Sequence, residues 1–159
     1  MFKIIGAVAV MIGALLFGTG KYNEIYERKR ILGEILEGTR KIKNDLLSVC
    51  LPLHESFFNA GDFFKEAATE IKKGELPQQA VNNTVQKIRW LKQSDIDVIR
   101  RFSSGLSAYD KEGQLANIDL FIKELENLFN KSKTELETKG VLFVKGSVLL
   151  GAAIVLILI

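Results

Sequence analysis

The last nineteen residues of the chain, 141–159, are apolar except for Lys145 and Ser147. A helix of this length rises about 28 Å, close to the roughly 30 Å hydrocarbon core of a bilayer. Lys145 lies about one helical turn inside the run, where its ammonium group can reach the interface along its methylene stem. The run therefore predicts a transmembrane helix, with the carboxylate of Ile159 expected at the far interface.

A second uncharged run covers residues 4–20, between Lys3 and Lys21. A secretory signal peptide has a similar basic start and apolar centre, and residues 18–20 resemble a small-x-small cleavage site. Against that interpretation, the run has no polar stretch before the possible cleavage site, and the sequence after it continues as a helix. We therefore predict an uncleaved transmembrane helix over residues 1–20.

Nearly all of the charged residues lie between these two runs. Residues 21–140 contain twenty basic and nineteen acidic side chains, a net charge of +1, which gives no reason to expect nucleic-acid binding. Their number suffices for one domain with its own core. The single cysteine, Cys50, excludes an intramolecular disulfide, fits a reducing compartment, and is most simply a small buried side chain.

Apolar spacings of three, four and seven residues predict helices throughout residues 21–140. Long helices are expected over 22–49 and from about Gln114 onward, the latter running directly into the second span. Shorter helices are expected near 53–60, 62–73, 77–90 and 94–106. Pro52 and Pro77 suit helix starts, Asp62 and Ser94 suit N-caps, and no stretch alternates as a strand does.

The predicted fold class is thus all-α: a bundle of about six helices flanked by N- and C-terminal transmembrane helices. Its three parts are residues 1–20, 21–140 and 141–159. Because both spans attach to the same domain, its two ends must return to one membrane face. The first and last long helices should therefore lie antiparallel and form a stalk.

Basic residues flank the inner ends of both spans. They are Lys21, Arg28, Lys29, Arg30 and Arg40 after the first span, and Lys123, Lys131, Lys133 and Lys139 before the second. Clusters of Lys and Arg resist translocation. We therefore expect the central domain in the cytosol and both termini outside.

Few residues suggest catalysis. The single histidine, His54, follows Cys50 by four residues, but the intervening Pro52 interrupts the helical register that would bring them together. The sequence offers no quartet of zinc ligands and no strand followed by a phosphate-binding glycine loop. Asp95 and Asp97 are explained by helix capping. We predict no enzyme activity, no metal and no cofactor.

Two basic clusters are candidate contact sites. The first consists of Arg28, Lys29 and Arg30 and suits anionic lipid headgroups, although interleaved acids make a solvated helix surface the better explanation. The second consists of Arg89, Lys92, Arg100 and Arg101. It is a candidate docking surface for another protein or, alternatively, an ordinary soluble face.

Small residues in the spans suggest helix packing inside the membrane. The candidate positions are Gly6 and Gly13 in the first span, and Ser147 and Gly151 in the second. Small residues at such spacing let helix backbones approach closely in lipid. We expect the two spans to pack on each other or on helices of a partner.

Three short stretches resemble the stage III sporulation protein AB family of endospore-forming bacteria. They are residues 52–57 (PLHESF), residues 110–114 (DKEGQ), and residues 139–142 (KGVL) leading into Gly146. Together they span nearly the whole chain in the expected order. The sequence departs from the family pattern at Ser56, where alanine is expected, and at Gly113 within the polar turn.

The resemblance implies a place beside a secretion-type ATPase, in a channel assembly that joins the mother cell and the forespore. The family's bundle is similar to the cytoplasmic domains of the platform protein in type II secretion and type IV pilus machines. The expected function is thus a membrane-anchored structural component, with the ATPase, other channel components and membrane lipids as partners. The alternative is a membrane-surface adaptor that anchors a soluble partner.

Overall fold

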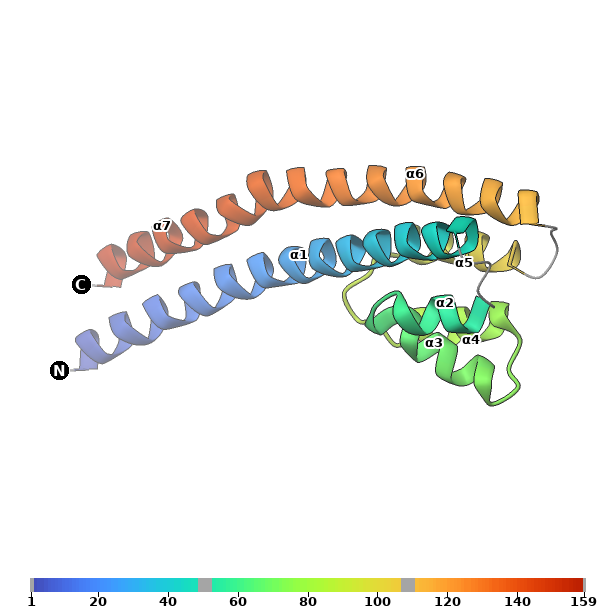
Figure 1. The fold of residues 1–159 in the computed structure, drawn as a ribbon. Helices are drawn as coiled ribbons and strands as arrows, with labels where there is room; N and C mark the ends of the chain where they lie inside the picture. The colour runs from blue at the N-terminus through green and yellow to red at the C-terminus, as the bar shows by residue number, and fades with distance from the viewer. Residues whose placement is uncertain (1, 49–52, 107–110, 159) are drawn as a thin grey trace. The chain divides into compact units, whose positions relative to one another are not determined.

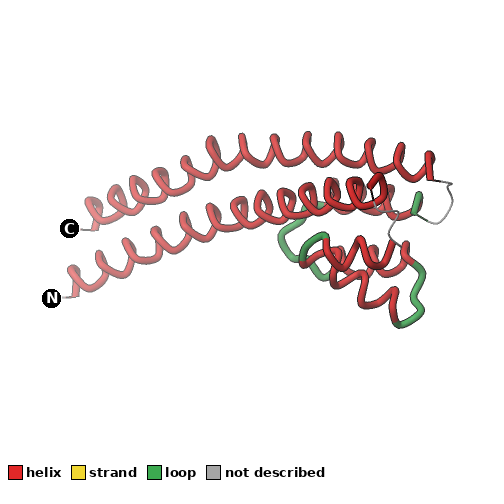
Figure 2. Tube along the Cα trace, viewed as in Figure 1, coloured by secondary structure: helices red, strands yellow, loops and turns green. Residues whose placement is uncertain are grey.

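A computed structural model describes residues 2–48, 53–106 and 111–158 (Figure 1). Within these ranges the chain contains helices and loops and no strand (Figure 2), so the predicted all-α class is confirmed. Residues 49–52 and 107–110, and with them Cys50, Pro52 and Asp110, lie outside the described residues. The elements are α1 (Phe2–Ser48), α2 (Leu53–Asn59), α3 (Asp62–Lys72), α4 (Pro77–Gln86), α5 (Gln93–Ser104), α6 (Lys111–Glu135), the π-helical turn η1 (Leu136–Gly140) and α7 (Val141–Leu158).

The chain forms two compact units. The first, here called the terminal unit, comprises Met1–Lys29 and Lys131–Ile159; the second, the bundle unit, comprises Arg30–Asn130. Helices α1 and α6 each contribute to both. The predicted division at residues 20 and 140 follows the expected membrane boundary, a different criterion, and stays a prediction.

In the terminal unit, α1 pairs antiparallel with α7 and η1. A Cβ atom added at Gly151 would lie 2.9 Å from Ala14, one at Gly18 would lie 2.9 Å from the Phe143 carbonyl, and one at Gly140 would lie 3.1 Å from Tyr22. As the residue number rises along α1, that of its neighbour falls. Figure 1 accordingly draws the start of α1 and the end of α7 at the same end of the pair.

The turn η1 joins α6 to α7 without a break. The sequence predicted that the last long helix would run directly into the second span, and the backbone does so through one π-helical turn. Such a turn accommodates one residue more than an α-helical turn does. It buries Leu136 and Gly140.

The outer surface of the terminal unit is apolar. Large exposed side chains include Ile5, Val8, Ile12, Leu16 and Phe17 on α1, and Leu142, Leu149, Leu150, Leu156 and Ile157 on α7. In the most apolar stretch of each of the two helices, 11% of the residues are buried inside the protein. The core helix of a soluble protein would be mostly buried, so these helices are compatible with membrane association.

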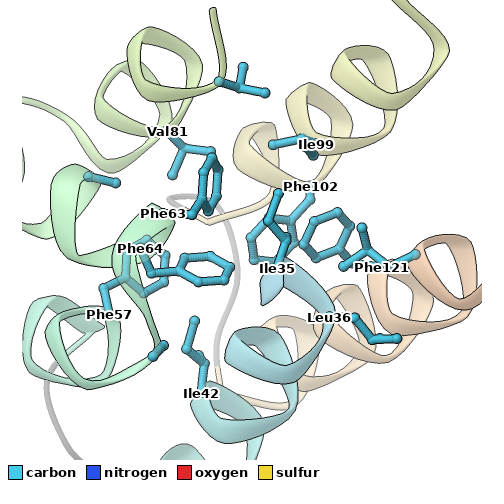
Figure 3. Packing of buried hydrophobic residues seen from close by; sticks show 14 of the residues in the cluster. Ile35, Leu36, Ile42, Phe57, Phe63, Phe64, Val81, Ile99, Phe102 and Phe121 are labelled. Atoms are coloured by element: carbon cyan, nitrogen blue, oxygen red, sulfur yellow. The ribbon is translucent and has the colours of Figure 1, made fainter. Parts of the chain in front are cut away.

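The bundle unit has the opposite arrangement, with a core of large apolar side chains (Figure 3). Phe64 is fully buried, with its ring centroid 5.1 Å from that of Phe57 and 4.9 Å from that of Phe63. Nearby, the rings of Phe102 and Phe121 stack at 4.0 Å between centroids and join α5 to α6. Burying these apolar side chains away from water is favourable, and the helices therefore pack around them.

Ion pairs connect α1 and α6 within the bundle unit. Arg40 Nη2 lies 2.7 Å from Glu126 Oε1, and Lys43 Nζ lies 2.6 Å from Asp119 Oδ1. The partner's number again falls as the number on α1 rises. The antiparallel pairing predicted for the two long helices is therefore present within each unit.

Three predicted helix starts differ from the structure. The N-cap of α3 is Gly61 at a φ of 112°, not Asp62, and the backbone N–H of Phe63 donates to Glu34 Oε1 of α1. The N-cap of α5 is Lys92, not Ser94, because the carboxylate of Asp95 reaches back to accept from the backbone N–H of Lys92 at 3.0 Å. Helix α6 begins at Lys111 and not near Gln114.

Candidate functional site

The first basic cluster divides into side chains with different surroundings. Arg28 is only 6% exposed, and its Nη1 donates to Glu135 Oε2 at 3.0 Å. Lys139 Nζ lies 3.7 Å from the other carboxylate oxygen of Glu135. Lys29 is half-buried, while Arg30 is exposed and lies 3.7 Å from Glu34. Arg28 thus holds α1 to α6, and contact of the cluster with lipid headgroups stays a prediction.

The second basic cluster lies on the α4–α5 loop and on α5. The Arg89 guanidinium lies over the Trp90 ring, 5.0 Å from its centroid. Arg101 Nη2 donates to Glu124 Oε1 of α6 at 2.8 Å. Arg100 lies 4.0 Å from Asp97, and Lys92 is the exposed N-cap of α5. All four are exposed, but carboxylates already accompany both α5 arginines, so a docking role for this cluster stays a prediction.

The small residues of the two spans fall into two groups. Gly151 packs against Ala14 and Met11, and Ser147 packs against Gly18. Ala14 and Gly18 are not among the predicted packing positions, although their spacing of four mirrors that of Ser147 and Gly151. Ala14 and Gly18 form a second small-xxx-small pair in the sequence. Recognising its role required knowing which residues of α7 lie opposite.

Gly6 and Gly13 do not take part in this contact. A Cβ atom added at either position would meet no heavy atom within 4 Å. Gly13 instead lines a shallow apolar groove of the terminal unit, together with Phe17, Gly146 and Leu150. Packing of a further helix at Gly6 or Gly13 stays a prediction.

The bundle unit carries ion pairs on its exposed faces. The pKa of the Arg40 guanidinium is raised because it donates hydrogen bonds to Glu126 and Glu37. The pKa of Lys87 on α4's C-cap is raised because its ammonium donates to Glu66 of α3 at 2.7 Å. These pairs connect neighbouring elements of the bundle unit.

No group of three or more His, Cys, Asp or Glu side chains suited to a metal ion occurs in the part of the chain that the structure describes. His54 is exposed, and its Nε2 lies 3.9 Å from Glu55 Oε1. Cys50 is outside the described residues, so the Cys50–His54 pair is not tested. The expectation that the chain has no enzyme activity therefore stays a prediction.

Comparison with known proteins completes this description. No curated protein and no solved structure matches the chain. The family model for stage III sporulation protein AB matches residues 3–159, essentially from end to end. Because the match covers both apolar helices and the bundle between them, the chain belongs to the stage III sporulation protein AB family.

Proposed function

We propose that this chain is a membrane-anchored structural component of a secretion-like sporulation complex, and that it couples a cytosolic ATPase to that complex. Membership of the family gives the chain a role in stage III of sporulation. The membrane anchor, the ATPase and the platform role are the parts that we add. In this proposal the protein acts in a channel between the mother cell and the forespore.

The observation that carries the proposal is the antiparallel pairing of two helices that are apolar on the outside. Large apolar side chains such as Leu16, Phe17 and Leu149 are 63–71% exposed. In water such a surface would be unfavourable by about 25 cal/mol per Å², whereas lipid accommodates it. We infer that both helices cross the bilayer side by side.

The pairing also determines on which side the remaining residues lie. The start of α1 and the end of α7 are at one end of the terminal unit, so both connections to residues 30–130 leave from the other end. Basic residues are concentrated at that second end, where Lys21, Lys133 and Lys139 are all exposed. By the positive-inside rule we assign residues 30–130 to the cytosol and both chain ends to the opposite side.

A cytosolic helical bundle is suited to transmit force or position. Its core is closely packed around phenylalanine rings, and ion pairs join α1 to α6 and α3 to Lys87 after α4. A packed core resists deformation and passes displacement from one surface to another. This supports a platform that links a cytosolic motor to components across the membrane.

The proposal is tested by purifying the full-length tagged chain from sporulating cells in mild detergent. We expect the sporulation ATPase to be retained, in the membrane fraction and with the chain. The same protein in nanodiscs of neutral lipid should bind the purified ATPase directly.

A different result would favour the alternative. If the ATPase is absent from both experiments, and the full-length chain in neutral nanodiscs instead binds anionic vesicles, the chain is a membrane-surface adaptor and the platform proposal is wrong. Recovery of the chain from the soluble fraction would contradict the membrane anchor itself.

A further inference from the structure

Helices α2 and α3 form a groove that none of the roles above uses. His54, Glu55 and Phe58 of α2 line one side, and Ala68, Thr69 and Lys72 of α3 line the other. The floor is the small side chain of Ala68, which is 3% exposed. A groove between two helices with a small floor is a shape that accepts a third helix.

Phe58 is the aromatic anchor in this groove. It is 54% exposed, and no other aromatic side chain in the described part of the bundle unit is comparably exposed. The phenylalanines that neighbour it in sequence, Phe57, Phe63 and Phe64, are all buried in the core. An aromatic side chain left at the edge of a concave surface is typical of the residues that dominate binding energy.

Two lysines of α3 lie at or beside the groove. Lys72 lines it, and Lys65 Nζ lies 5.3 Å from the centroid of the Phe58 ring. Neither lysine forms an ion pair with a carboxylate of the described residues. The acids Glu66 and Glu70 on the same helix are instead paired with Lys87 and Lys73.

Helix α3 therefore has two differently charged faces. One is acidic and neutralised by pairing, and the other, which borders the groove, carries Lys65 and Lys72. Among the described residues that line the groove, Glu55 is the only acidic side chain. A ligand that complements this surface has to combine apolar side chains with carboxylates.

We propose that the α2–α3 groove binds an acidic amphipathic helix of a partner protein. The apolar face of that helix packs on Phe58 and Ala68, and its carboxylates pair with Lys65 and Lys72. A concave slot fits the convex surface of a helix, whereas a bilayer is met best by a protruding face. The inference rests on the proposed function in one respect: the groove would be a surface through which the proposed platform holds a partner.

The test uses full-length protein in nanodiscs of phosphatidylcholine and a fluorescent helical peptide of about 16 residues. The peptide carries leucines at positions i, i+3, i+4 and i+7 and glutamates elsewhere; a second peptide has lysines in place of the glutamates. Fluorescence anisotropy measures both affinities. We expect the wild-type protein to prefer the glutamate peptide.

Charge reversal in the protein should reverse this preference. The double variant Lys65→Glu/Lys72→Glu should bind the glutamate peptide about tenfold more weakly and the lysine peptide more tightly. Phe58→Ala should weaken binding of both peptides, because the apolar anchor is lost. The matched controls are Lys123→Glu and Leu120→Ala, which change an exposed lysine without an ion pair among the described residues and a 59% exposed leucine on α6.

Three results would overturn the inference. The first is no preference of the wild-type protein between the two peptides, or no binding of the glutamate peptide. The second is an equal loss of affinity in the α6 controls. The third is that phosphatidylglycerol vesicles, and not the peptide, bind in a way that depends on Lys65 and Lys72, which would identify a lipid-contact surface.

These measurements need neither the ATPase nor sporulating cells. Their failure would leave the platform proposal intact. Conversely, a chain that does not retain the ATPase but passes the peptide test would keep the groove and lose the platform.

Discussion

Phe64 of the bundle unit is fully buried, whereas Phe17 of the terminal unit is 63% exposed. The same contrast runs through the two units. The bundle unit packs large apolar residues inside and places ion pairs outside, while the terminal unit packs Gly18, Gly151 and Ala14 inside and displays leucine, isoleucine and valine outside.

The difference supports the proposal that the bundle unit lies in water and the terminal unit in lipid. In water, burying an apolar side chain is itself favourable, so large residues mark the interior. In lipid that force between helices is absent, and close backbone approach through small residues is what holds them together. Helix α1 follows both rules along its length. In its first half small residues pack against α7, and in its second half large residues are buried in the core.

The largest effect is expected from removing a large core side chain. Phe64→Ala should lower the free energy of unfolding by about 3–5 kcal/mol, because it leaves a cavity beside Phe57 and Phe63. Phe17→Ala should change it by less than about 0.5 kcal/mol. Denaturant unfolding of the full-length chain in detergent, followed by circular dichroism, measures both; equal effects would contradict the division between the units.

The next largest effect concerns a charged pair in the terminal unit. Arg28→Ala should cost about 3 kcal/mol, because Glu135 is left largely buried without the guanidinium that lies 3.0 Å from it. The double variant Arg28→Met/Glu135→Met should recover most of that loss. The control is Lys21→Ala, which removes an exposed pair with Glu24 and should cost about 0–1 kcal/mol. Thermal unfolding in detergent distinguishes them, and a harmless Arg28→Ala would mean that the pair does not hold these helices.

Close backbone approach is expected to matter in the bundle unit as well. A Cβ atom at Gly38 would collide with the carbonyl of Ala60 and lie 2.8 Å from the Phe64 ring. Gly38→Ala should therefore cost about 1–3 kcal/mol despite the better helix propensity of alanine. Gly13→Ala, with open space around it, should be neutral or slightly stabilising. A tolerated Gly38→Ala in the same unfolding assay would place α1 farther from Ala60 and Phe64 than the structure does.

The smallest effect tests polar groups inside the bundle. Ser56 is fully buried, and its hydroxyl has no hydrogen-bond partner among the described residues. Ser56→Ala should raise the free energy of unfolding by about 1 kcal/mol, because it removes an unsatisfied polar group. The control is Ser103→Ala: this hydroxyl is equally buried but bonds Asn82 and the Arg100 carbonyl, so its loss should destabilise. A loss of stability on Ser56→Ala would show that the hydroxyl has a partner.

The elements of the fold could be predicted from the sequence because their signals are local. Pro77 occupies the first turn of α4, Gly74 adopts a φ of 100° after α3, and Phe64, Ala67 and Ala68 form a buried stripe at helical spacing. Each of these depends on residues within one or two turns. The same is true of the two apolar end helices, whose composition alone identifies them.

The features that escaped prediction depend on residues far apart in the chain. The sequence suggests an exposed cation at Arg28, because its partner Glu135 is 107 positions away. Ala14 and Gly18 became recognisable only opposite Ser147 and Gly151. The α2–α3 groove likewise requires knowing that Phe58 and Lys72 border one surface. A single sequence provides no means of pairing such positions.

The central claim, that the paired terminal helices cross a membrane with residues 30–130 on the cytosolic side, is tested most directly by cysteine labelling in intact cells. In a background without the native Cys50, one variant carries Gln79→Cys at an exposed position of α4, and another carries Phe2→Cys at the start of α1. A membrane-impermeant maleimide should label position 2 in intact cells, and position 79 only after permeabilisation. Labelling of position 79 in intact cells, or of neither position until lysis, would contradict the account.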